Sequence, residues 1–310
     1  MKNTIKLLVA VCFGAGLIAG CAPKTTIKES EMAVNVRGEL KEGQQVGPKK
    51  KIAVIAFDNK TAYGQTRLGT AASDILTTEL GKSGRFILIE RDKMDKILAE
   101  KKLQTTGAVA ADQIASSGKV LGLNAIVTGS ISQFGVKTEG EDYLVYESKK
   151  QIAEATVDLR IVDVSDGKIL WTDSGKGVAQ KKVSATLGMG GRSGYDETLE
   201  GEALRAAIVK FVNNIIDKID QMEWYCYVAE VDNDNIYLDS GKESGLAVNS
   251  KLKVTRPGKP IISKSTGVTI GNVENDVGMI EVVKYLGENG AVAKVVSGEK
   301  PQPGDICRVK

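Results

Sequence analysis

The sequence VDLRIVDVSDGKILW, residues 157–171, contains the clearest structural signal in the chain. Apolar and polar residues alternate from Ile152 to Val164, as in a strand that buries one face. The dipeptide Asp166-Gly167 follows, and it strongly favours a tight turn between antiparallel strands. The chain becomes apolar again at residues 168–171. The sequence therefore predicts a β-hairpin here, within a largely antiparallel sheet.

Apolar strands and amphipathic helices are predicted on both sides of this hairpin. The strands are short apolar runs bounded by turn residues, and the helices have apolar residues at three- and four-residue intervals. These helices and strands do not alternate strictly along the chain. Such an order favours an α+β domain, with helices packed on a mostly antiparallel sheet. We assign this domain to residues 51–222, with strands at 52–57, 86–89 and 124–134 and helices at 68–80, 94–98, 110–121 and 204–219.

Beyond Met222 the pattern contains only strands. Short β-type segments are separated by Gly, Asn, Asp or Pro, which is typical of a small barrel. Residues 223–310 are therefore predicted to form a small all-β, barrel-like domain, with strands at 225–231, 235–238, 251–255, 268–273, 278–285 and 291–296.

The first twenty residues have the features of an export signal. Lys2 and Lys6 precede the apolar run Leu7–Ala19, which is too short to span a bilayer as a helix. The run ends in LIAGC, which resembles the lipobox of bacterial lipoproteins, so Cys21 is the expected site of acylation, including palmitate. An ordinary signal peptide with a chance cysteine nearby is the alternative. We assign residues 1–20 to the signal peptide and residues 21–50, which lack apolar periodicity, to a lipidated tether.

Composition excludes several classes of function. The chain has no histidine, which excludes imidazole bases, Ser-His-Asp catalysis and histidine-ligated metals. The formal net charge of +3 includes Lys2 and Lys6, so the exported chain is almost neutral and lacks the dense basic face of a nucleic-acid binder. We therefore expect neither an enzyme nor a cofactor, metal or nucleic-acid site.

Two cysteines remain after Cys12 is removed with the signal and Cys21 is acylated. Cys226 and Cys307 lie near the two ends of the predicted barrel, where its first and last strands would meet. An exported protein folds where disulfides can form. The sequence leaves two alternatives open for this pair, a disulfide or two buried free thiols.

Four blocks of residues 51–222 resemble, in order, those of the CsgG family of outer-membrane lipoproteins, which includes the curli secretion channel. The last of the four contains the hairpin described above. The region after residue 223 resembles the C-terminal module of the flagellar assembly protein FlgT, in ESGLAVNSKLKV and PQPGDICRV; the curli channel lacks such a module. The CsgG-like blocks are KKIAVIAFDN, FILIERDKMDKILAEKKLQTTG, GKVLGLNAIVTGSI and VDLRIVDVSDGKILW.

The resemblance implies a ring of subunits in which each protomer contributes two hairpins to a transmembrane barrel. The candidate segments are residues 135–151, within the hairpin 135–160, and residues 171–187. The first is highly charged: its alternation is expected to place Glu141, Glu147 and Lys149 on one face and Asp142 and Lys150 on the other. The second has one nearly apolar face, broken by Lys181. The resemblance also implies a channel constriction in the loop DNKTAYGQ, where Asn59 and Tyr63 are the candidate residues.

These observations predict a non-enzymatic lipoprotein, anchored in the outer membrane and facing the periplasm. It would be a component or assembly factor of a curli-type channel that exports surface-fibre subunits, acting as a homo-oligomeric ring. The alternative is a lipoprotein that does not insert and serves as an adaptor for flagellar, peptidoglycan or other envelope machinery. The charged first hairpin and the extra β domain favour the alternative.

Overall fold

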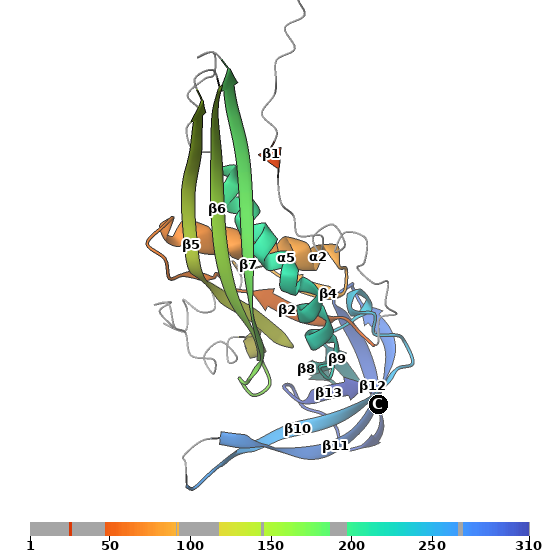
Figure 1. Cartoon of the computed structure of the whole chain (residues 1–310). Helices are drawn as coiled ribbons and strands as arrows, with labels where there is room; N and C mark the ends of the chain where they lie inside the picture. Colours follow the sequence, from red (N-terminus) through yellow and green to blue (C-terminus); the bar gives the residue numbers. More distant parts are fainter. Residues whose placement is uncertain are drawn as a thin grey trace, which may run out of the picture.

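A computed structural model describes residues 25–26, 47–90, 92, 118–143, 146–186, 197–265 and 269–309. Cys21, most of the tether and most of the helices predicted at 94–98 and 110–121 lie outside these residues. The described chain forms an α+β part with long strands and, at its other end, a small barrel (Figure 1). This architecture confirms the predicted fold class.

The α+β part is a mixed sheet in the order β1-β7-β6-β5-β2-β4, with β3 beside β5. β5, β6 and β7 are antiparallel to one another, whereas β2 lies parallel to both β4 and β5. The predicted hairpin is confirmed, since Ile161 pairs with Trp171 across the β6–β7 turn. The strands are β1 (Thr25–Thr26), β2 (Lys50–Val54), β3 (Asp58–Asn59), β4 (Phe86–Ile89), β5 (Ala125–Tyr143), β6 (Tyr146–Asp163) and β7 (Ile169–Thr186).

The strand predicted at 124–134 is much longer in the structure. β5 continues to Tyr143, and β6 begins at Tyr146, so the candidate segment 135–151 is the outer half of one β5–β6 hairpin. The sequence there is rich in charged residues and lacks the apolar run that would have extended the predicted strand.

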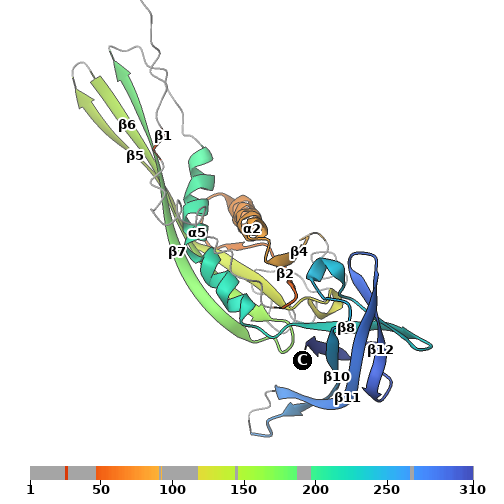
Figure 2. The same ribbon diagram turned by 90° about the vertical axis from the view of Figure 1, so that its right-hand side faces the viewer.

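Two helices confirmed by the structure, α2 (Gln65–Lys82) and α5 (Thr198–Asp220), pack on one face of the sheet. In Figure 2, α5 runs along the sheet beside β7, and α2 lies against α5 on the same side of the sheet. α5 lies very close to β7 because two glycines face it: a Cβ on Gly177 would lie 2.0 Å from the carbonyl oxygen of Ala203, and one on Gly175 would lie 2.3 Å from that of Ala207. The core between these layers includes the fully buried Phe211.

The second part is a closed barrel in the order β10-β11-β12-β9-β8-β13. The strands predicted at 268–273 and 278–285 are one continuous strand, β11, which kinks at register shifts instead of ending. The barrel strands are β8 (Tyr225–Asp232), β9 (Asn235–Leu238), β10 (Lys251–Ile262), β11 (Thr269–Leu286), β12 (Gly290–Gly298) and β13 (Ile306–Val309), with a short 3-10 helix, η1 (Lys242–Ser244), after β9.

Within the residues that the structure describes, no helix is long and apolar enough to cross a membrane.

Candidate functional site

The loop between β2 and α2 contains both residues predicted to form a constriction, and the structure places them in one hydrogen-bonded turn. The Asn59 side chain organises this turn: its amide donates to the carbonyl oxygens of Tyr63 (2.5 Å) and Gln65 (2.6 Å), and its Oδ1 accepts from the Thr61 backbone N–H (3.0 Å). Asn59 therefore fixes the loop backbone in this conformation.

Tyr63 points from this loop toward α5. Its hydroxyl donates to Glu200 Oε1 at 2.7 Å, and its ring lies 4.8 Å from that of Phe134 on β5. Arg67 on α2 donates to the other carboxylate oxygen of Glu200 at 2.6 Å. Glu200 is only 2% exposed and lies in the first turn of α5, where the helix dipole favours a negative charge. A buried carboxylate thus ties the loop to both helices.

Sequence reasoning did not identify Glu200 or Arg67. The only signal was an acidic residue at the start of an otherwise apolar helix face, which is common on solvated helices. The contact joins residues more than a hundred positions apart, and the sequence alone offers no indication of that pairing.

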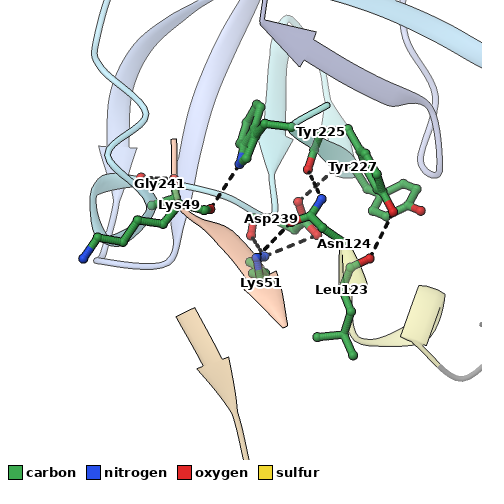
Figure 3. Close-up of polar contacts among 10 residues, drawn as sticks. Lys49, Lys51, Leu123, Asn124, Tyr225, Tyr227, Asp239 and Gly241 are labelled. Atoms are coloured by element: carbon green, nitrogen blue, oxygen red, sulfur yellow. Dashed lines mark hydrogen bonds and ion pairs between the residues drawn. The ribbon is translucent and has the colours of Figure 1, made fainter. Parts of the chain in front are cut away.

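A second buried polar cluster joins the α+β part to the barrel (Figure 3). Asn124 is its centre: Oδ1 accepts from the Lys51 backbone N–H (2.8 Å), and the amide donates to the Tyr225 carbonyl oxygen (3.0 Å). The Tyr225 hydroxyl donates back to the carbonyl oxygen of Leu123 at 3.1 Å. These bonds pair the start of β5 with the start of β8.

Lys51 and Asp239 complete this junction. The Lys51 ammonium donates to the Asp239 carbonyl oxygen and lies 3.5 Å from Asp239 Oδ2, while Oδ1 accepts from the Tyr227 N–H at 2.9 Å. The Trp224 indole donates to the carbonyl oxygen of Lys49 at 3.2 Å. Since these polar groups are paired across the contact, the barrel is held against the end of the sheet in a defined orientation.

Burial shifts the pKa values of titratable groups at the junction. It raises the pKa of Asp239 above its usual value, although the Lys51 ammonium acts in the opposite direction. Burial likewise raises the pKa values of the Tyr225 and Tyr227 hydroxyls and lowers that of the Lys50 ammonium. The junction therefore disfavours the charged form of its carboxyl group.

We expect Asp239→Asn to change the pH dependence of stability. Because the folded pKa of Asp239 is raised, its contribution is most favourable below the unfolded pKa of about 3.9 and is lost as pH rises through the folded pKa. The wild-type free energy of unfolding should therefore fall relative to that of Asp239→Asn between acidic and neutral pH. Urea unfolding across this range measures the difference, with the exposed Asp234→Asn as the matched control. A constant difference would contradict the prediction.

The outer half of the β5–β6–β7 sheet has charged residues on its uncovered face. Lys137 lies 3.2 Å from Glu139, and Lys176 lies 2.9 Å from Glu154, which connects β5, β6 and β7 through ion pairs. On the other face, a polar row formed by Thr138, Gln151 and Lys181 crosses the strands.

The expected distribution of charges over the two faces of the first hairpin is wrong. The register pairs residue 141 with residue 148 and residue 142 with residue 147, so odd positions of β5 share a face with even positions of β6. Positions 142, 147 and 149 therefore fall on the same side as the polar row, which is also the side of the nearly apolar face of β7.

Cys226 and Cys307 lie directly opposite each other on β8 and β13, and both are buried, free thiols in this structure. Burial raises the pKa of the Cys226 thiol. The two cysteines are therefore neighbours on the first and last strands of the barrel, as the sequence indicated. A disulfide between them stays a prediction. Among the described residues no group of three or more acidic or cysteine side chains is arranged to hold a metal ion.

Comparison with known proteins identifies related sequences. The family model "Curli production assembly/transport component CsgG" matches residues 33–245. A protein of Neisseria meningitidis serogroup B that is named as a lipoprotein, NMB1126/NMB1164, is 30% identical over 236 residues, covering 72% of this chain and 98% of the relative. The curli production assembly/transport component CsgG of Escherichia coli K12 is 26% identical over 250 residues, covering 68% of this chain and 88% of the relative.

Among solved structures, the lipoprotein GNA1162 of Neisseria meningitidis is similar over 53% of this chain and 99% of its own, with 16% identity and a TM-score of 0.34. The family match ends at residue 245, so most of the barrel lies beyond it. The resemblance of this region to FlgT stays a prediction.

Proposed function

This chain belongs to the CsgG family, and we propose that it is a lipid-anchored outer-membrane protein that acts in envelope assembly from the periplasmic face, without inserting its strands into the bilayer. The relatives named as a lipoprotein and as assembly/transport components support an envelope role. On this proposal Cys21 holds the protein at the membrane, and the protein acts by binding partners rather than by catalysis.

The observation that carries the proposal is that each face of the outer β5–β6–β7 sheet contains charged side chains. A strand that crosses a membrane needs ~9–11 residues with an apolar side toward lipid. Here one face carries Lys137, Glu139 and Glu154 in ion pairs, and the other carries Gln151 and Lys181 in one row. A lysine that faces lipid at mid-depth destabilises insertion by ~2–4 kcal/mol.

A second candidate function is favoured by strand length. β5 has 19 residues and β6 and β7 have 18 each, so each continues well beyond the part covered by α5. Strands of this length are sufficient for the ring-shaped channel for fibre subunits that the sequence resemblance implies, and the relatives are named as assembly/transport components. In such a channel Asn59 and Tyr63 would have to leave the contacts they make here to form a constriction.

Membrane fractionation of cells that express the full chain distinguishes the two functions. We expect Cys21→Ser to move the protein from the outer-membrane fraction to the soluble periplasmic fraction. On the proposal, the acyl chains on Cys21 are the protein's only attachment to the membrane, and the substitution removes them. Cys226→Ser, which removes a buried thiol, is the control and should stay membrane-bound. If Cys21→Ser remained in the outer membrane and the purified protein conducted ions in planar bilayers, the strands would insert and the channel function would replace the proposal.

A further inference from the structure

Two strands of the barrel extend past it as an isolated ribbon, which we call the arm (residues 256–265 and 269–277, including the described start of its turn). β10 pairs with β13 only as far as Thr255, and β11 pairs with β12 only from Gly278 onward. Beyond these points no third strand of the described chain pairs with the arm. Figure 1 shows it projecting sideways from the barrel, below the sheet. A two-stranded ribbon is marginally stable alone in water, so the arm has a surface suited to contact with another molecule.

The arm combines exposed apolar side chains with positive charge. Ile261 is 47% exposed, Ile262 is 55% exposed and Val273 is 42% exposed. Lys259 and Lys264 flank the isoleucines, and neither has an ion-pair partner among the described residues. The acidic residues at the base of the arm are already paired with Lys253 and Arg308 of the barrel. The outer arm is therefore basic and apolar.

The opposite wall of the barrel has the complementary character. In the closed strand order, β8 and β9 are separated from β10 and β11 by β12 on one side and β13 on the other. The β8–β9 turn carries Glu230, Asp232 and Asp234, all exposed and without a cationic partner among the described residues. We call these three residues the acidic turn. Figure 2 shows the β8–β9 hairpin projecting to the right of the barrel and the arm to the lower left.

Exposed apolar residues lie next to the acidic turn. β12 runs antiparallel to β9, with Ala293 opposite Ile236, so the residues that follow Ala293 continue toward the β8–β9 turn. Val295 and Val296 occupy that stretch and are 42% and 50% exposed. Acidic and apolar groups are thus adjacent on one wall, just as basic and apolar groups are adjacent on the arm.

We propose that the arm of one copy of this chain docks on the acidic turn and Val295–Val296 of a second copy. The two surfaces are made of different residues, so the contact is head-to-tail and each copy at the end of a chain of copies keeps one free surface. Opposite charges would orient the encounter, and the exposed isoleucines and valines would be covered on contact. This inference goes beyond the proposed function and does not require it, since the contact would form between detergent-solubilised copies whether or not any strand enters the membrane.

A charge-swap experiment on the full-length protein in detergent tests this contact by sedimentation velocity. The wild type should self-associate, more weakly as salt is added. Lys259→Glu with Lys264→Glu, and separately Asp232→Lys with Asp234→Lys, should each raise the dissociation constant by about tenfold or more, because like charges then face each other. The protein with all four substitutions should regain wild-type association. Lys60→Glu with Lys119→Glu, two exposed lysines of the α+β part, is the matched control and should behave as wild type.

Circular dichroism and thermal unfolding confirm that each variant is folded, as expected for substitutions of exposed residues. The proposal is overturned if the wild type is monomeric at all concentrations, if the arm variant associates as the wild type does, or if the fourfold variant does not recover. Loss of binding to anionic phosphatidylglycerol vesicles by the arm variant, with self-association unchanged, would also overturn it and would identify a lipid surface as the arm's partner.

Discussion

Gly177→Ala is expected to destabilise the protein by about 3 kcal/mol, through overpacking between α5 and β7. The new Cβ would lie 2.0 Å from the carbonyl oxygen of Ala203 and 2.4 Å from the backbone nitrogen of Ala207. Both neighbours are helix backbone, so α5 would have to move as a body away from the sheet, and the buried contacts around it would loosen. Urea unfolding of the purified protein without residues 1–20 measures the loss.

The matched control for this substitution is Gly140→Ala on β5, because, apart from its chain neighbours, no described atom lies within 4 Å of the position its Cβ would take. Neither glycine has a positive φ, so backbone strain contributes little to the change in the free energy of unfolding in either variant. The control should change the free energy of unfolding by less than about 1 kcal/mol. Equal stability of the two variants would mean that α5 does not lie against β7 as described.

Glu200→Ala should destabilise the protein by about 2–3 kcal/mol, the range for hydrogen bonds to a charged group. The substitution leaves the Tyr63 hydroxyl without its acceptor and removes the partner of Arg67. Arg67 is 57% exposed on its side chain and can be rehydrated, so most of the loss comes from Tyr63 and from the cavity beside it. Chemical unfolding gives the magnitude, with Glu197→Ala, an exposed residue at the same helix end, as the control.

A double-mutant cycle separates the hydrogen bond from general packing. Tyr63→Phe keeps the ring against Phe134 and removes only the hydroxyl, so it should cost about 1 kcal/mol in the wild type. In the Glu200→Ala background the same change should cost much less, because the hydroxyl has already lost its acceptor. Additive effects would show that Tyr63 and Glu200 do not interact.

The sequence predicted those features that depend on local signals. Asp166-Gly167 marked the β6–β7 turn, and the apolar intervals in 68–80 and 204–219 located the two helices, although α5 begins earlier than predicted, at Thr198. Short strands separated by turn residues predicted a barrel-like domain after residue 223, which the structure shows as a closed barrel. In each case, residues close together in the chain carry the information.

Features set by distant contacts were not predictable from local patterns. The outer parts of β5 and β6 are strands because each residue pairs with one on the neighbouring strand, although the sequence there is rich in charged residues. Asn124 looked like the first residue of a strand. Its side chain, however, bonds to the backbone of Lys51 and to that of Tyr225, which lies 101 positions after Asn124. Glu200 resembled any acidic residue at a helix start. A single sequence has no pattern that records such long-range partners.

The path of the N-terminal chain has a mechanical consequence. The chain enters the sheet at β2 beside the junction, where Lys49 bonds to Trp224 and Ser244, but Thr25 and Thr26 pair with the outer part of β7. A pull applied to the chain before Thr25 would first peel this two-residue strand from β7, one pair at a time. The load would then pass to Lys49, where bonds to the barrel and the strand β2 resist it together. On the proposed anchoring at Cys21, β1 would thus separate from the sheet before the rest of the fold bears the load.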